Sequence, residues 1–431
     1  MSDAVPALVA GAEPQEGDAA TRIAPTFVLL FSVAPGVPGG PRPLEQPPGI
    51  EPLDVHALAA YREHVEQRQR RLLGDAYVQA RRLQREPVGR LALDDDGAPD
   101  GLAPRHADVW LVRHKSGAAV WEVWLSAPEQ PLDAPRWIAW LDRSRDDSLA
   151  ARIWARLAPA RVAPEMDLPL VVLRMPGDPT TPGALDALTR RHGPALVKLL
   201  HRDPMPTPFK ARFVAEELAG DFCRRGDGLS LLSRNAAIDV HVQTAPDAGA
   251  DAPMPRNTLP LLVTLELLCL ERGVLRGLLE RSAAGRVATI DALVALRRDM
   301  IDGLEEYYGT LARAHGYMAE ATARGETLFG IDDLFESVVD RVEALTFEIT
   351  TRNQQTVNRI GFWLTILFGA IETGFVASSI ATWYYTDDLA AVLAWTVGVT
   401  VLTALAIAAL LRAQPSTALL TALDAARQQR V

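Results

Sequence analysis

Two long apolar stretches lie near the C-terminus, IGFWLTILFGAIETGFVASSIATW at Ile360–Trp383 and LAAVLAWTVGVTVLTALAIAALL at Leu389–Leu411. Glu372 is the one charged residue of the first stretch, and the second contains none. Each is longer than the about 20 residues that an α-helix needs to cross a hydrocarbon core of about 30 Å. Since Tyr384–Asp388 between them can form only a tight turn, the sequence predicts a membrane hairpin of two helices.

The charges that flank the hairpin predict its orientation. Arg352 and Arg359 precede the first stretch and Arg412 follows the second, whereas the turn carries Asp387 and Asp388 and no Lys or Arg. Loops that carry Lys and Arg stay on the cytoplasmic side of a membrane. We therefore expect a multi-pass protein of the cell inner (plasma) membrane, with both termini in the cytoplasm and the turn outside.

The whole chain is predicted to be an α+β membrane protein: an N-terminal cytoplasmic α/β domain, a long helical stalk and a C-terminal transmembrane hairpin. The first residues lack a basic region followed by an apolar core, so a signal peptide is not expected. The predicted segments are a disordered tail over 1–24, the α/β domain over 25–255, the stalk region over 256–359, the hairpin over 360–412 (helices 360–383 and 389–411) and a cytoplasmic tail over 413–431.

Within the α/β domain, short runs rich in Val, Ile, Leu and aromatic residues predict strands, and apolar residues that recur every three or four positions predict helices. The predicted strands are Thr26–Val33, Val109–Arg113, Ala119–Leu125, Leu168–Arg174, Leu229–Leu232 and Ile238–Val242. The predicted helices are Leu53–Leu83 and Leu185–Leu200. After them the pattern changes to long helices, at Leu261–Arg281, at Ile290–Ala323 and from Ile331 into the hairpin.

The helix that begins near Ile331 carries an apolar heptad seam, which packs helices around a common axis. The seam could join copies of the chain or pack against neighbouring helices of the same chain. Acidic residues of this helix could bind a regulatory divalent cation between subunits, or could form a solvated face. The seam residues are Ile331, Phe335, Val338, Val342, Leu345 and Ile349, and the metal candidates are Asp332, Glu336 and Asp340.

Glu372 lies halfway along the first apolar stretch, where a carboxylate is costly to keep in lipid and normally faces a bundle interior or water. At spacings of three and four residues it shares a small and polar stripe, which would line a pore in a symmetric oligomer. The stripe residues are Asn358, Thr365, Gly369, Glu372 and Ser379. In the alternative, Glu372 is protonated or hydrogen-bonded to a neighbour such as Thr403 and simply holds helices together.

A second pattern on the same stretch predicts close helix packing. Gly361, Thr365, Gly369, Thr373 and Ala377 place a small residue at every fourth position, as in helices that approach each other closely. This pattern shares Thr365 and Gly369 with the polar stripe, so the sequence leaves open which face points toward a partner helix.

Composition excludes some classes of function. The net charge is −10 without a Lys- or Arg-rich block, so we expect no nucleic-acid partner. The sequence has no GxxxxGK[ST], no HExxH and no glycine fingerprint of a dinucleotide site, so it predicts no enzyme and no catalytic residues. Cys223 and Cys269 form no CxxC pair, and Cys269 in an apolar run is expected to be a buried, reduced thiol.

The order of these elements resembles the CorA family of divalent-cation channels, which have an N-terminal α/β domain, a helical pair, and a stalk helix that continues into the first of two C-terminal membrane helices. The family carries Gly-Met-Asn at the outer end of that helix. When Leu364-Thr365-Ile366 is matched to the similar run of the family, the outer pore mouth falls on Thr382, Trp383 and Tyr384, followed by Asp387 and Asp388, so the motif itself is absent.

The resemblance implies a homo-oligomer, a pentamer in that family, that conducts cations through the bilayer and is gated from its cytoplasmic domain. The chain's partners would be copies of itself, lipid and a metal cation. No cofactor is implied beyond a transported or regulatory divalent cation, Mg²⁺ or Zn²⁺. The alternative is a membrane-anchored sensor or effector, for example of a defence system, whose cytoplasmic domain binds a signal and whose hairpin perturbs the membrane.

Overall fold

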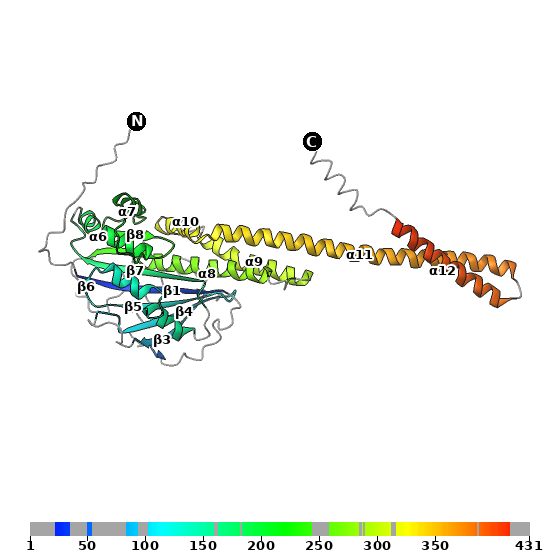
Figure 1. Cartoon of the computed structure of the whole chain (residues 1–431), viewed down its shortest axis with the longest axis horizontal. Helices are drawn as coiled ribbons and strands as arrows, with labels where there is room; N and C mark the ends of the chain where they lie inside the picture. Colours follow the sequence, from blue (N-terminus) through cyan, green and yellow to red (C-terminus); the bar gives the residue numbers. More distant parts are fainter. Residues whose placement is uncertain are drawn as a thin grey trace, which may run out of the picture. The chain divides into compact units, whose positions relative to one another are not determined.

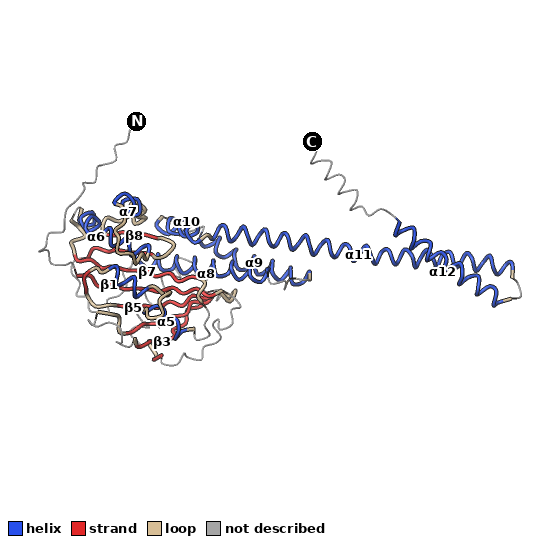
Figure 2. Tube along the Cα trace, in the orientation of Figure 1, coloured by secondary structure: helices blue, strands red, loops and turns tan. Residues whose placement is uncertain are grey.

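The computed structural model divides the chain into two compact units, which are described separately below. The sheet unit comprises Met1–Val287 and Asp291–Val342, and the hairpin unit comprises Glu343–Val431 together with Ala288–Ile290. Figures 1 and 2 show the elements of both units. The structure describes residues 22–34, 50–53, 83–93, 102–158, 163–181, 183–243, 258–283, 287, 289–311, 316–385 and 388–413.

A single mixed sheet forms the centre of the sheet unit, with its strands in the order β2-β3-β4-β5-β1-β7-β9-β8, while β6 pairs with β1. β1 is antiparallel to both of its main neighbours, and β7 runs parallel to β9. The strands are β1 Arg22–Val33, β2 Ile50–Glu51, β3 Leu83–Ala92, β4 His106–His114, β5 Ala119–Ser126, β6 Gln130–Pro131, β7 Met166–Pro176, β8 Gly228–Leu232 and β9 Ala237–Gln243. All six predicted strands are therefore present.

β1 lies inside the sheet and is buried along nearly its whole length. A strand covered on both faces reads as a continuous apolar run, because neither face meets water. Phe27, Leu29 and Phe31 face one side and join the main apolar core, while Val28 and Leu30 point to the other side and are just as buried. The run TFVLLFSV thus indicates helices on both faces of the sheet.

Helices cover each face. The core that contains Phe27 and Phe31 is closed by α4 Ala134–Leu141, α5 Leu149–Leu157 and α6 Ala184–His201. Phe27 meets Trp137 of α4 edge-on at 5.6 Å between ring centroids. The opposite face contacts α8, Thr258–Ala283, which packs on β1, β5 and β7. The short helix α7, Ala211–Leu218, packs on α6.

The sequence did not predict β3, because its residues QREPVGRLA lack the alternation of a strand. Pro87 and Gly89 produce an irregularity in its pairing with β4. Gly89 has φ of +147°, and a Cβ placed there would lie 2.4 Å from the carbonyl oxygen of Glu51 on β2. Most of the predicted helix over 53–83 lies outside the described residues, and Leu83 itself begins β3. The start of β1 also differs from the prediction. β1 begins at Arg22, whereas the disordered tail is predicted to extend over 1–24.

The helical region differs from the prediction at one place. The single helix expected over Ile290–Ala323 is wrong: the chain forms α9, Ile290–Leu311, and a separate α10, Tyr317–Phe329. Gly325, the glycine of Arg-Gly-Glu, does not end a helix but lies within α10. A Cβ at this position would meet the Leu268 side chain of α8 at 2.3 Å, so close packing explains why glycine stands there. α10 ends instead at Gly330, in the left-handed conformation. α11 then runs without a break over Ile331–Tyr384.

We predict that Gly89→Ala destabilises the protein by about 1–3 kcal/mol, because the backbone conformation is strained for a residue with a Cβ and the added methyl would meet the β2 backbone. The thermal midpoint of the full chain in detergent measures this. Gly226→Ala is the matched control, since a Cβ there has open space and φ is outside the left-handed range. Equal midpoints for the two variants would contradict the close contact between β2 and β3.

Candidate functional site

The hairpin unit contains two helices that are long and apolar enough to cross a membrane, the second half of α11 and α12, Leu389–Ala413. Their apolar surface is largely uncovered: 17% of the apolar window of α11 and 0% of that of α12 is buried. Phe375 is 72% exposed and Leu402 is 70% exposed. The predicted helix bounds of 360–383 and 389–411 agree with these elements, although α11 begins far upstream of its apolar part.

One face of α11 packs on α12. Ile366, Ala370 and Ala381 are buried on this face. A Cβ on Gly374 would lie 2.3 Å from Oγ1 of Thr400 on α12, so a larger residue at position 374 would force the helices apart. A Cβ on Gly369 would approach Ile407 at 2.9 Å. Of the predicted small-residue pattern, Gly369 makes such a close contact, whereas Gly361 has open space around it and Thr365 is exposed; Gly374, the closest point to α12, does not belong to the pattern.

The predicted polar stripe lies on a different side of α11. Asn358, Thr365, Glu372 and Ser379 are exposed, and only Gly369 is half-buried toward α12. Among the described residues, no hydrogen bond joins Glu372 to Thr403 or to any other side chain. The structure thus leaves the carboxylate available to something outside this chain.

The hydroxyl groups of the stripe are oriented by their own helix. Thr365 donates its hydroxyl hydrogen to the Gly361 carbonyl at 2.9 Å, and Ser379 donates to the Phe375 carbonyl at 2.9 Å. Each hydroxyl oxygen keeps lone pairs that can accept a hydrogen bond or contact a cation. The exposed face of α11 therefore presents oxygen atoms at positions 365, 372 and 379.

At the turn between the helices, Thr382, Trp383 and Tyr384 are exposed, with Trp383 at 79%. Thr382 donates its hydroxyl hydrogen to the Ser378 carbonyl at 2.7 Å. Asp388 begins α12, and its Oδ1 accepts hydrogen bonds from the backbone N–H groups of residues 390 and 391 at 3.1 and 3.2 Å. Asp387, the other predicted residue of the pore mouth, lies outside the described residues.

The apolar seam of α11 is buried within a single chain. Ile331, Val338, Val342, Leu345 and Ile349 are each less than 10% exposed, and Phe335 is half-buried. Packing within the chain, one of the two alternatives, is enough to explain this burial. The metal candidates Asp332, Glu336 and Asp340 do not converge: in the part of the chain that the structure describes, no three His, Cys, Asp or Glu side chains could hold a metal ion.

In the sheet unit, a buried ionic triad joins α8 to the sheet. Arg85 of β3 donates to Glu122 of β5 at 2.8 Å and also bonds to Glu266 of α8, and all three side chains are at most 3% exposed. Trp124 also donates its indole N–H to Glu122. Burial raises the pKa of Glu266, and Arg85 opposes this shift. Burial therefore favours the neutral form of Glu266 in this triad.

The sequence contains one local signal for this triad. Glu266 is the one charged residue within the apolar run Leu259–Leu270, and a lone carboxylate in such a run requires a partner. Cys269 of the same helix is a buried free cysteine, as expected.

A second buried polar network lies where β8 and β9 meet the first residues of α8 and α10. Asp239 accepts hydrogen bonds from Ser230 at 2.7 Å and from Thr258 at 2.6 Å, and Tyr317 donates to Ser230 at 3.1 Å. His241 contacts both Asp239 and Thr258 through the same ring nitrogen, Nε2. A hydrolytic triad needs its acid and its hydroxyl on opposite ring nitrogens, so this network ties elements together and does not relay protons.

Acidic side chains from three helices meet at Glu271 of α8. Its carboxylate is 2% exposed, and burial, followed by repulsion from Glu326 of α10 and Asp332 of α11, raises its pKa to about 8. Within the described part of the chain, no partner bonds its Oε2 atom. Glu271 therefore holds a proton at neutral pH where α11 begins.

We predict that Arg85→Met destabilises the full chain by about 3–5 kcal/mol, because Glu122 is then buried without its counter-charge. Glu266→Gln is the matched variant: it keeps an acceptor for Arg85 and replaces a protonated acid by a neutral amide, so its cost should be below about 1.5 kcal/mol. Denaturant unfolding in detergent measures both. Equal costs would show that Glu266 carries a charge in the folded protein.

We predict that Glu271→Gln makes the protein more stable relative to wild type as pH rises from about 5 to about 8. The folded wild type keeps the Glu271 proton in this range, whereas the unfolded chain loses it, so the wild type loses stability as pH rises. The variant does not titrate. Thermal midpoints at several pH values test this, with Glu280→Gln, exposed on the same helix, as the control. Parallel curves for Glu271→Gln and wild type would refute it.

Comparison with known proteins identifies no relative of this chain, so its function has to be inferred from the geometry described above. No protein-family model, no curated protein and no solved structure matches the chain. The resemblance to the CorA family therefore stays a prediction that rests on the order of the helices. What is established is a mixed sheet covered by helices, followed by two long apolar helices with an exposed polar stripe on the first.

Proposed function

We propose that the chain is an integral membrane protein anchored by α11 and α12. A long apolar helix can also be the core helix of a soluble protein, which is buried, or a signal sequence, which lies near the N-terminus. Here the large apolar side chains are exposed around both helices, and both lie near the C-terminus. Exposed apolar area on this scale needs a cover of lipid or protein. The flanking arginines favour cytoplasmic termini in a cell inner membrane.

We further propose that copies of the chain assemble into a cation channel in which the polar stripe of α11 lines the pore. The exposed carboxylate of Glu372 carries this proposal. A carboxylate that faces acyl chains is costly, and α12 does not shield it, so an arrangement of copies with this face inward is favoured. A ring of carboxylates then attracts cations, and the oxygens of Thr365 and Ser379 lie one heptad to either side.

The number of copies and the ion are inherited from the resemblance to the CorA family, which implies a pentamer, a divalent cation such as Mg²⁺ or Zn²⁺, and gating from the cytoplasmic domain. No nucleotide hydrolysis is needed, since the ion gradient drives the flux. Asp332, Glu336 and Asp340 could bind a regulatory cation only where two copies of the chain meet. Among the described residues of one chain they form no metal site.

The alternative is a membrane-anchored sensor or effector whose hairpin perturbs the bilayer after its cytoplasmic domain binds a signal. The turn favours it in one respect: Thr382, Trp383 and Tyr384 stand where the CorA family has Gly-Met-Asn. Two bulky, exposed aromatic residues suit a lipid interface better than a site for a hydrated cation. Leakage that begins after a signal is added and does not distinguish cations from anions would support this alternative.

We predict that Glu372→Gln lowers the cation-to-anion permeability ratio about tenfold, because loss of a unit charge beside an ion in a partly hydrated pore changes its free energy by ~1–4 kcal/mol. Purified full-length protein in liposomes, with Mg²⁺, Zn²⁺ and K⁺ flux measured separately, provides the assay. Glu348→Gln makes the same change at an exposed position of α11 before the apolar stretch.

Two further results sharpen this test. Glu372→Arg should convert the remaining permeability to anion preference if the side chain faces the ion path. Unchanged selectivity in both Glu372 variants, with the oligomer intact by light scattering, would remove Glu372 from the pore. A monomeric wild type in detergent and in bilayers would rule out the channel itself.

A further inference from the structure

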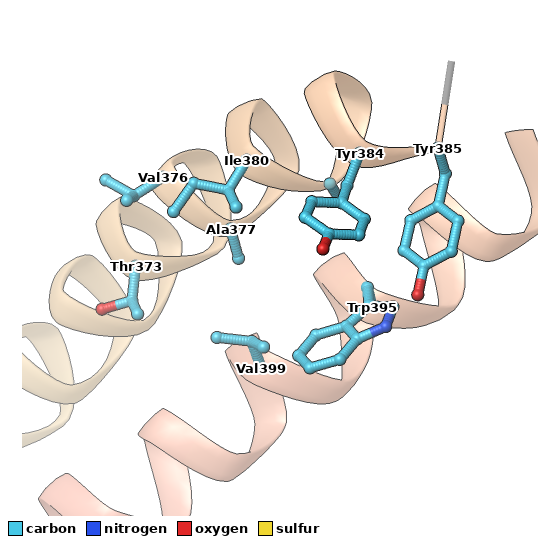
Figure 3. Close-up of a pocket in the computed structure, with 9 residues that line it drawn as sticks. Thr373, Val376, Ala377, Ile380, Tyr384, Tyr385, Trp395 and Val399 are labelled. Carbon is cyan, nitrogen blue, oxygen red and sulfur yellow. The ribbon is translucent and has the colours of Figure 1, made fainter. Parts of the chain in front are cut away.

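A cavity lies between α11 and α12 next to the turn, inside the hairpin unit (Figure 3). Its volume is 430 Å³, within the range of about 300–1,000 Å³ that ligand sites occupy. It is open on one side, where Val376 and Ile380 of α11 are each 60% exposed. A ligand can therefore enter from the medium that surrounds the helices and does not have to come through the protein.

The lining of the cavity changes along its length. Val376, Ala377 and Ile380 of α11 and Val399 of α12 give its middle a purely aliphatic wall. The aromatic side chains of Tyr384, Tyr385 and Trp395 gather at the end next to the turn, and both tyrosine hydroxyls point toward α12 (Figure 3). Such a lining suits an elongated molecule with an apolar body and one polar end.

The polar end has unused hydrogen-bond donors. Among the described residues, no hydrogen bond engages the hydroxyl groups of Tyr384 and Tyr385 or the indole N–H of Trp395. Tyrosine and tryptophan at a membrane interface keep an apolar body in the lipid and a polar group toward the headgroups. Three such donors side by side can bind the ester or phosphate oxygens of a lipid.

The charges at this end select the kind of headgroup. Asp388 follows the tyrosines and already occupies the N-terminus of α12, so the positive end of that helix is not available to an anion. The turn sequence carries Asp387 and Asp388 and no Lys or Arg. Net anionic headgroups would be repelled here, whereas an ammonium group is attracted by the carboxylates and by the faces of the aromatic rings.

We propose that this cavity binds one acyl chain of a zwitterionic phospholipid, with the ester and phosphate oxygens at the Tyr384–Tyr385–Trp395 end and the ammonium group toward Asp388. The proposal rests on the membrane insertion of the hairpin and is independent of the channel. A lipid held in this position fills the space between the two helices next to their turn.

The test uses full-length protein in liposomes and a phosphatidylethanolamine with a photoreactive diazirine in one acyl chain. After irradiation, mass spectrometry should find labels at Val376, Ile380 and Val399 at least about fivefold more often than at Leu402 and Leu405, which are exposed elsewhere on α12. Phosphatidylglycerol with the same diazirine should label the cavity several times less. Tyr385→Phe should reduce this headgroup preference and keep the acyl-chain label.

Ala377→Phe places an aromatic ring in the cavity and should abolish the enrichment of the label at the cavity residues. Ala406→Phe adds the same ring at an exposed position of α12 that does not line the cavity, and it should leave the label unchanged. Glu372→Gln should also leave it unchanged, because that side chain faces elsewhere. Flotation with liposomes verifies that each variant has inserted.

The experiment distinguishes failure of the membrane hairpin from failure of the lipid site alone. A wild type that does not float with liposomes refutes the membrane hairpin, and the lipid site with it. A protein that floats but is labelled equally at Val399 and Leu402 has only the general lipid annulus, which overturns the site alone. A photoreactive residue at position 380 that crosslinks to a second copy, and not to lipid, would show that protein fills the cavity and would also overturn it.

Discussion

The apolar surface that the chain leaves uncovered on α11 and α12 is the constraint on which the rest of the structure depends. The core of the sheet unit is closed, and Phe27, Phe31 and Trp137 there are all but inaccessible. The same chain leaves Phe375 and Leu402 more than two-thirds exposed. Water penalises such exposure by about 25 cal/mol per Å², so these helices need a cover of lipid or protein. The close contacts at Gly369 and Gly374 fit the proposed membrane location, because helices in lipid associate through tight packing.

The sheet unit differs in that it buries ionisable side chains in its interior. α8 carries Glu266 and Glu271 within a nearly continuous apolar surface, and each is buried on a different side of that helix. Glu266 docks on Arg85 and fixes α8 to the sheet. Glu271 meets acids of α10 and α11 and avoids repulsion by keeping its proton. Buried polar groups of this kind add little net stability, but they penalise any other placement of the helix.

Sequence predicted the elements well wherever one physical signal dominated. The uncharged runs gave both hairpin helices, and the continuous apolar run of β1 gave the central strand. β3 was missed because Pro87 and Gly89 interrupt its pattern, and its stability comes from pairing with β4. The predicted helix over 290–323 ends too early because a glycine pattern places its end at position 325, and it does not separate α9 from α10, which begins after Gly316 with φ of +65°. Contact with Leu268 explains the glycine at position 325, and no local pattern reports such a contact.

The sequence predicts which residues of α11 belong to the candidate site, but it does not predict which face of the helix points toward α12. Thr365 and Gly369 belong both to the polar stripe and to the small-residue pattern, so one helix alone cannot show which pattern faces a neighbour. The position of α12 separates the shared residues: Gly369 lies close to Ile407 of α12, whereas Thr365 is exposed. The buried triad of Arg85, Glu122 and Glu266 is harder to predict from the sequence, because Arg85 and Glu266 are 181 positions apart. Its one local signal is the isolated carboxylate in an apolar run.

The heptad register of α11 explains why the polar stripe stays uncovered. Ile331 and Phe335 begin a seam that repeats every seven residues, and the same register reaches Ile366 and Ala370, which are buried against α12. Asn358, Thr365, Glu372 and Ser379 each precede a seam position by one residue, so they are rotated by about 100° from it. A single neighbouring helix cannot cover both directions. The chain therefore buries its apolar seam against its own helices and leaves the Glu372 carboxylate exposed on the adjacent face.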